Sequence, residues 1–286
     1  MPHLALPAAY KHAIRGAFPR SESGRTYAVA DAEGNFVANA SKASRKDARD
    51  AVVAARAAVK GWSGATAYNR GQVLYRIAEL LEGRRAQFVD EITRLEGVSV
   101  AAANAQVDAS IDLWIWYAGW TDKHAQVAGN GNAVSGPYFN ISVPEPTGVV
   151  AVIVPQGSSL LGFVSAVAPP LVTGNTVVAI ASERFPLSAI SLAEVLATSD
   201  VPGGVVNVLT GSPAEMAPWL ASHADVNALD LAGAENLDWI DLQIEAADTL
   251  KRVLAPEMGV DAVAPSLDRI TAFTELKTVW HTKSLI

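Results

Sequence analysis

The stretch GVVAVIVPQGSSLLGFVSAVAPPLVTGNTVVAIASE, residues 148–183, decides the fold. It holds two apolar runs rich in β-branched residues, 149–154 and 176–181, and between them a segment, 160–171, that can form a helix. Strands buried on both faces of a parallel sheet have short, continuous apolar sequences of this kind. The stretch therefore predicts a β-α-β unit.

No residue between Pro146 and Ser182 is charged, so a membrane-spanning helix has to be considered. Such a helix needs about 20 consecutive apolar residues. This stretch is broken by turn-forming and helix-breaking residues, namely Pro155, Gly157, Pro169, Pro170, Gly174 and Asn175. We therefore expect buried strands rather than a membrane span.

Alternation of strands and helices continues towards the C-terminus. Further strands are predicted at 205–209 and 226–231, and helices at 187–198, 213–222 and 237–250. Outside this alternation, strands are predicted at 138–143, where residues 144–148 break the pattern, and at 270–280. In the last helix, Ile240, Ile244, Ala247 and Leu250 are expected to face inward. Strands that alternate with helices through short connections indicate an α/β fold, a doubly wound, Rossmann-like parallel sheet.

The N-terminal part of the chain is predicted to be helical. Ser44 and Asp47 have the form of a capping box at the start of a helix that reaches Trp62. Three more helices follow, with apolar residues at three- and four-residue spacing, the last running from about Ser99 towards Lys123. These helices are expected to cover the sheet as a layer.

Composition excludes several classes of protein. The 286 residues include no cysteine, which rules out disulfides, cysteine-ligated metal sites and a thiol nucleophile within this sequence. A net charge of −7 argues against a nucleic-acid or acidic-membrane partner. The N-terminus lacks a basic segment leading into an apolar one, so we expect a cytoplasmic protein.

No self-sufficient catalytic motif is present. There is no Walker loop, no GxGxxG that opens a helix after a strand, and no GxSxG elbow. The five histidines are scattered, so no metal site is expected. These residues alone indicate an α/β domain, with a nucleotide site at its strand ends as one interpretation.

Several ordered motifs resemble the aldehyde dehydrogenase superfamily. They are 114–123 (WIWYAGWTDK), 145–150 (EPTGVV), 168–178 (APPLVTGNTVV), 186–189 (PLSA) and 202–211 (PGGVVNVLTG). The resemblance extends from about residue 20 to 257. It implies the coenzyme-domain fold of that family, with a helical part at 1–128, a bridging hairpin at 129–147, a Rossmann-like part at 148–259 and an oligomerisation strand at 260–286.

The resemblance also implies where this chain departs from the family's catalytic pattern. Gly157 stands where the family has an oxyanion-binding asparagine, and Ile180 stands for its ribose-binding lysine. In register, Pro256 replaces the general base, and Glu257 would serve only after a one-residue slip. Positions that match a dinucleotide site are Glu183, Gly211 and Gly233, with the acidic Glu235 close to the last of them. No catalytic residue and no cofactor are therefore expected, and NAD(P) would bind weakly if at all.

The family's catalytic domain is expected to be missing after Gly259, because the sequence passes directly to a segment resembling the family's C-terminal oligomerisation strand. In the family, this strand and the bridging hairpin form an arm that docks on a neighbouring subunit. The residues predicted to associate are Tyr138, Phe139, Ile141, Val143, Phe273, Leu276, Val279 and Trp280.

The leading hypothesis is a non-catalytic subunit that joins a full-length aldehyde dehydrogenase in a hetero-oligomer. Three alternatives stay open. One is a homodimer through the helical faces, another is an NAD(P)-binding protein or residual oxidoreductase, and the third is a decayed gene product with a stable fold and no partner.

Overall fold

The computed structural model describes residues 9–256 and 264–283. Its centre is a five-stranded parallel sheet in the order β10-β9-β6-β7-β8. The strands are β6 (Val149–Ile153), β7 (Thr176–Ile180), β8 (Val206–Leu209), β9 (Ala228–Asp230) and β10 (Arg252–Leu254). Strand order runs outward in both directions from the β6/β9 pair, which makes this pair the switch point of a doubly wound sheet. The predicted fold class is confirmed.

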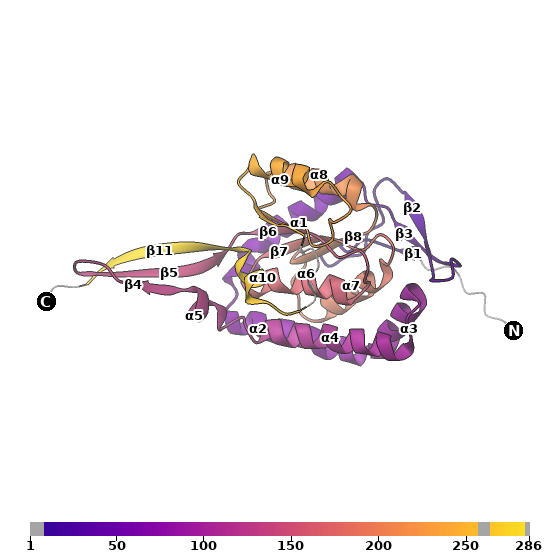
Figure 1. The fold of residues 1–286 in the computed structure, drawn as a ribbon, viewed down its shortest axis with the longest axis horizontal. Coiled ribbons are helices and arrows are strands. Elements are labelled where there is room, and N and C mark those ends of the chain that lie inside the picture. The colour runs from indigo at the N-terminus through magenta and orange to yellow at the C-terminus, as the bar shows by residue number, and fades with distance from the viewer. Residues whose placement is uncertain (1–8, 257–263, 284–286) are drawn as a thin grey trace.

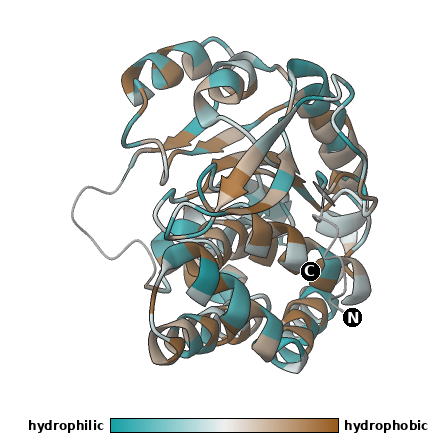
Figure 2. Cartoon of the chain, turned by 90° about the vertical axis from the view of Figure 1, so that its right-hand side faces the viewer, coloured by the Kyte–Doolittle hydropathy of each residue, from teal (hydrophilic) through white to brown (hydrophobic). Residues whose placement is uncertain are grey.

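Helices cover both faces of the sheet (Figure 1). One face carries α1 (Arg45–Gly64), α8 (Pro213–Ser222) and α9 (Trp239–Ala247). The other carries α6 (Leu161–Val172) and α7 (Leu187–Thr198), which are covered in turn by α2 (Ala67–Gly83), α3 (Arg85–Glu96) and α4 (Val100–Ala118). Hydrophobic residues concentrate along the central strands and the helix faces turned towards them (Figure 2). The apolar runs at 149–153 and 176–180 are fully buried, as their sequence predicted.

The predicted helix start at Ser44 is present as a capping box. The Ser44 hydroxyl accepts from the amides of Lys46 and Asp47, while the Asp47 carboxylate accepts from the Ser44 amide at 2.8 Å. Preceding this helix is a small sheet of β1 (Ala9–Tyr10), β3 (Phe36–Ser41) and β2 (Thr26–Ala30).

A third sheet projects from the body as an extended arm (Figure 1). It consists of β4 (Asn130–Asn132), β5 (Tyr138–Pro146) and β11 (Thr274–Thr282), in the order β11-β5-β4. Two short helices stand at its base, α5 (His124–Ala128) and α10 (Leu267–Thr271). We call β4, β5 and β11 the arm. Residues far apart in the sequence thus form one antiparallel ladder.

Two boundary predictions at the arm were wrong. The last strand begins at Thr274 rather than Ile270, because Ser266 caps a helical turn over 267–271. The strand β5 runs through Pro144 to Pro146, where a break was predicted. Beyond Ser142 it pairs only with β11, so each proline can turn its ring nitrogen to the unpaired side.

The predicted inward face of the helix after β9 was also wrong. Helix α9 ends at Ala247 and buries Leu242 and Ala246, whereas Ile240 and Ile244 are 55% and 63% exposed. Its sequence carries two apolar stripes, and only the one formed by Leu242 and Ala246 packs towards the sheet. Among the described residues, no helix combines the length and apolar character needed to cross a bilayer.

Candidate functional site

In a doubly wound sheet, ligands bind beyond the carboxyl ends of the strands at the switch point. In this chain the corresponding loops follow β6, β7, β8 and β9. Phosphate binding there depends on free backbone N–H groups. Whether these loops can bind a phosphate therefore depends on which of their N–H groups already donate within the chain.

The side chain of Gln156, in the loop after β6, hydrogen-bonds to backbone groups just beyond the ends of β6 and β7. Its Nε2 donates to the Val154 carbonyl at 2.7 Å, and its Oε1 accepts from the Glu183 amide at 2.9 Å. The Ser182 hydroxyl donates to the Gln156 carbonyl at 2.9 Å. The amide of Glu183, the predicted ribose-binding position, is therefore already engaged.

Glu96, at the end of α3, accepts hydrogen bonds from Ser159 in the loop between β6 and α6. Its Oε1 accepts from both the amide and the hydroxyl of Ser159, at 2.7 and 2.6 Å. Its Oε2 accepts from Gln106 at 2.7 Å. A protein carboxylate thus lies against the loop that precedes α6, in the kind of position where an anion would otherwise bind.

Three successive amides of the loop after β9, at the predicted phosphate turn, donate within the chain. Ala232 N–H donates to Asp230 Oδ1 at 3.0 Å, Gly233 N–H to the Ile153 carbonyl at 2.8 Å, and Ala234 N–H to the Leu231 carbonyl at 2.9 Å.

The two predicted glycines have structural reasons for being glycine. Gly211 adopts a φ of +125°, and a Cβ there would lie 3.0 Å from the Ala43 amide nitrogen. A Cβ on Gly233 would collide with the Val154 carbonyl. Backbone packing therefore accounts for both residues without a bound phosphate.

Acidic side chains lie at the cleft and in the adjoining hollow. Glu183 is exposed, and its carboxylate, second to burial, raises the pKa of the Tyr27 phenol. Asp238, Asp241 and Glu245 line a hollow of about 240 Å³ between α8 and α9, with no cation in its lining. Ile180, in the family's lysine position, is fully buried in β7 and cannot reach the surface.

The other described positions that match the family's catalytic residues carry no reactive side chain. A side chain added at Gly157 would meet nothing within 4 Å, so the position is open but bears no side-chain donor. Pro256 carries no base, and Glu257 lies outside the described residues. Within residues 9–256 and 264–283, no three histidine or carboxylate side chains gather in a way that could hold a metal ion.

The arm gathers most of the predicted association residues. Those with large exposed surfaces, between 38% and 63%, are Tyr138, Phe139, Ile141, Val143, Leu276 and Trp280. The pairing register places Tyr138 and Trp280 on one face, where their rings meet edge to face at 5.8 Å. Phe139, Ile141, Val143 and the half-buried Val279 share the other face.

Phe273 does not belong to this surface, although it was predicted to. Its side chain is fully buried in the chain's own core. Its carbonyl accepts from Asn175 Nδ2 at 2.9 Å and from the Thr147 amide at 3.2 Å. Phe273 is therefore an anchor for the base of the arm rather than an association residue.

The outer edge of β11 faces away from β5, and no described strand pairs with it. A long unpaired edge is a template for another chain, because its N–H and C=O groups lack partners. Sequence reasoning located this edge. It did not find Gln156 or Glu96, since polar residues in loops give no signal of which amides they will bind.

Comparisons with known proteins agree with the fold described above. Residues 18–264 match the profile described as the aldehyde dehydrogenase family. The mitochondrial aldehyde dehydrogenase family 2 member B4 of Arabidopsis thaliana is 32% identical over 244 residues, which cover 84% of this chain and 45% of that protein. The 2-hydroxymuconic semialdehyde dehydrogenase of Pseudomonas sp. (strain CF600) is 36% identical, with 78% of this chain and 47% of that protein covered.

Solved structures give the same result. HpcC from Thermus thermophilus superposes with a TM-score of 0.82 at 31% identity, covering 88% of this chain and 48% of that one. The NAD+ complex of an aldehyde dehydrogenase from Bacillus cereus superposes with a TM-score of 0.80 at 26% identity, covering 86% and 50%. The chain spans about half the length of the curated relatives it matches.

Proposed function

The chain belongs to the aldehyde dehydrogenase family, and we propose that it is a non-catalytic member that assembles with a full-length aldehyde dehydrogenase through its arm. The observation that carries the proposal is an exposed apolar arm, in a chain whose strand-end cleft has several backbone donors engaged internally.

The arm supports assembly through its edge and its faces. Strand β11 offers nine residues, Thr274–Thr282, with an unpaired outer edge. Apolar side chains stand on both faces of the arm sheet, including Ile141 on one and Trp280 on the other. An added strand would satisfy the edge, and a partner surface would cover the faces. A full-length relative is the partner whose sheet is shaped for such an arm, as the family resemblance implies.

Loss of catalysis is supported by the residues at the reacting positions. A family reaction needs a thiolate nucleophile, an oxyanion donor and a base. This sequence has no cysteine, has Gly157 at the oxyanion position and has Pro256 at the base position in register. In the proposed complex, the partner supplies all of the chemistry.

The cleft residues do not fit NAD(P). The amides of Glu183, Ser159 and Gly233 donate to protein acceptors. A pyrophosphate would lose these three donors, and acidic residues line the adjoining hollow without a cation. We therefore derive no step through the coenzyme.

Co-expression tests the proposal. An affinity-tagged copy of this chain should retain an untagged full-length aldehyde dehydrogenase from the same genome through purification. Replacing the partner's nucleophilic cysteine should then abolish all dehydrogenase activity of the purified complex. Activity that survives that replacement would contradict a non-catalytic role for this chain.

The second candidate is an NAD(P)-binding protein or residual oxidoreductase. It is favoured by the exposed carboxylate of Glu183 at the ribose position, and structural neighbours include NAD+ complexes. Two solution measurements separate it from the first.

Calorimetric titration of the purified chain with NAD+ and NADP+ is expected to give no micromolar binding, because the amides of Glu183, Ser159 and Gly233 are engaged. The double variant Gln156→Ala/Glu96→Ala frees the amides of Glu183 and Ser159, and it should bind either coenzyme more tightly than the wild type does. Micromolar binding by the unmodified chain would favour the second candidate.

A further inference from the structure

A separate polar pocket lies on the small N-terminal sheet, and its lining includes no residue of the arm or of the loops that follow the central strands. Its volume is about 280 Å³, near the lower end for small-molecule sites. Six of its lining residues bear on its chemistry: Lys11, Arg20, Arg25, Thr26, Asn39 and Ser41.

The pocket is cationic although the chain is acidic. Its lining includes three basic residues and no carboxylate, in a protein of net charge −7. Arg25 is partly neutralised, since its Nη2 lies 3.4 Å from Glu215 Oε2 at the protein surface. Neither Lys11 nor Arg20 makes a side-chain hydrogen bond or an ion pair with any residue that the structure describes. Among the described residues, therefore, two cations at this pocket have no ion-pair partner.

Neutral donors point to the same ligand chemistry. Thr26 and Ser41 are cross-strand partners, and Asn39 lies two residues before Ser41 on the same face of the sheet. Ser41 is only 4% exposed, and its hydroxyl has no hydrogen-bond partner among the described residues. The side chains of Thr26 and Asn39 are likewise uncommitted within the described part of the chain. Hydroxyl, amide and cationic donors together suit a ligand that is rich in acceptor oxygens.

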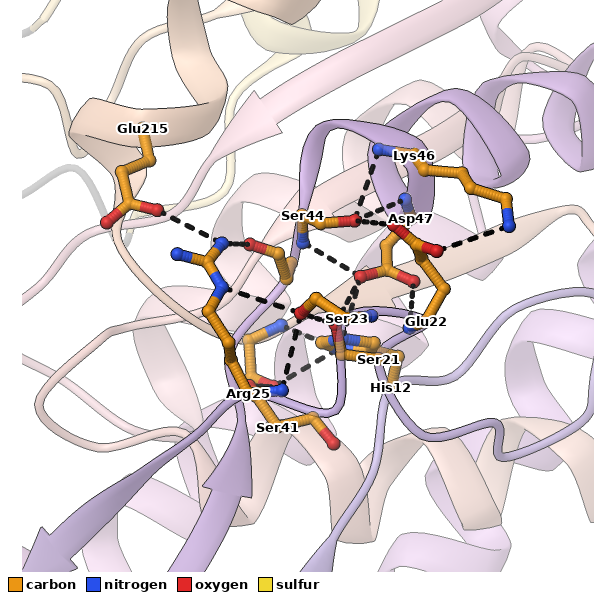
Figure 3. Close-up of polar contacts among 12 residues, drawn as sticks. His12, Ser21, Glu22, Ser23, Arg25, Ser41, Ser44, Lys46, Asp47 and Glu215 are labelled. Atoms are coloured by element: carbon orange, nitrogen blue, oxygen red, sulfur yellow. Dashed lines mark hydrogen bonds and ion pairs between the residues drawn. The ribbon is translucent and has the colours of Figure 1, made fainter.

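Hydrogen bonds to Asp47 hold the turn that precedes Arg25 (Figure 3). Asp47 accepts from the Ser21 hydroxyl at 2.7 Å and from the Glu22 amide at 3.1 Å. Burial alone would raise the pKa of Asp47, but these hydrogen bonds and the one from the Ser44 amide lower it, so the carboxylate remains charged. The pocket is therefore built on a fixed frame.

We propose that this pocket binds a small phosphomonoester, with its phosphate held by Lys11 and Arg20 and by the hydroxyl of Ser41. The volume of about 280 Å³ leaves room for an organic group beside the phosphate. The ring of Tyr10 lies in the same lining and offers an apolar wall for the organic part. The lining shares no residue with the arm, so the inference stands independently of hetero-assembly.

Calorimetric titration of the full chain with inorganic phosphate tests this assignment, with ionic strength held constant by sodium chloride. Lys11→Ala/Arg20→Ala should weaken phosphate binding at least about tenfold, because it removes both uncompensated cations. Ser41→Ala should weaken it less, by about three- to tenfold. Lys60→Ala, an exposed lysine outside the pocket, should bind phosphate as the wild type does.

Thermal melting of each variant shows whether it is folded, so that loss of binding is not mistaken for loss of structure. The proposal is overturned if the wild type responds to phosphate no more than to chloride. It is equally overturned if the folded double variant keeps the wild-type Kd for phosphate.

Discussion

Asp230→Asn is expected to lower the free energy of unfolding by about 3–5 kcal/mol, the usual cost of removing one partner of a buried ion pair. Asp230 is fully buried at the end of β9, and Arg269 is 3% exposed in α10. The Arg269 Nη2 lies 2.7 Å from Asp230 Oδ2. After the substitution, a guanidinium would remain buried opposite a neutral amide.

This ion pair is important because it joins the segment after residue 263 to the central sheet. The arm strand β11 begins five residues after Arg269, so the pair fixes the direction in which the arm leaves the body. The Asp230 carboxylate also accepts from the Ala232 amide at 3.0 Å, in the loop beside the strand-end cleft. One carboxylate therefore organises both regions.

Equilibrium unfolding in urea measures this effect, with Glu275→Gln as the matched control. Glu275 pairs with Arg252 at 2.6 Å in the same part of the molecule, but both side chains are about half exposed. Exposed pairs contribute about 0–1 kcal/mol. If the two substitutions cost the same, the buried pair does not anchor the C-terminal segment as described.

Ile141→Asp is expected to reduce association with a full-length aldehyde dehydrogenase by at least about 100-fold, as expected when a charge is buried in an apolar contact. Ile141 is 43% exposed at the middle of the arm, opposite Val279. Because the side chain is not buried within the monomer, the substitution creates no cavity in its core. Its effect should fall on the complex rather than on the fold.

Val100→Asp is the control for this substitution, since Val100 is 60% exposed at the start of α4 and lies outside the arm. Removal of residues 274–286, which deletes β11, provides a second test. Association that persists in both arm variants, each shown by circular dichroism to be folded, would place the interface elsewhere. The apolar stripe of Ile240 and Ile244 on α9 would then be the first surface to examine.

The sequence was informative wherever burial leaves a periodic pattern. The runs at 149–153 and 176–180 gave the central strands, and Ser44 with Asp47 gave the first helix start. Periodicity could not decide between two apolar stripes on one helix, which is why the facing of Ile240 and Ile244 was predicted wrongly. For the same reason, Phe273 looked like its exposed neighbours on β11 until the fold placed it in the core.

The candidate site was predictable only in part. Comparison with family motifs identified positions such as Gly157 and Ile180 where a functional side chain is replaced. Gln156 binds the amide of Glu183, 27 residues away, and Glu96 binds the amide of Ser159, 63 residues away. No local sequence pattern predicts such contacts. The cationic pocket likewise combines residues from three strands and a turn.

Native mass spectrometry of this chain co-expressed with a full-length aldehyde dehydrogenase from the same genome tests the central claim most directly. We predict species whose masses require both polypeptides, and we predict their disappearance when residues 274–286 are removed. Observation of this chain only as a monomer or homodimer, with the partner assembled without it, would contradict the proposed function.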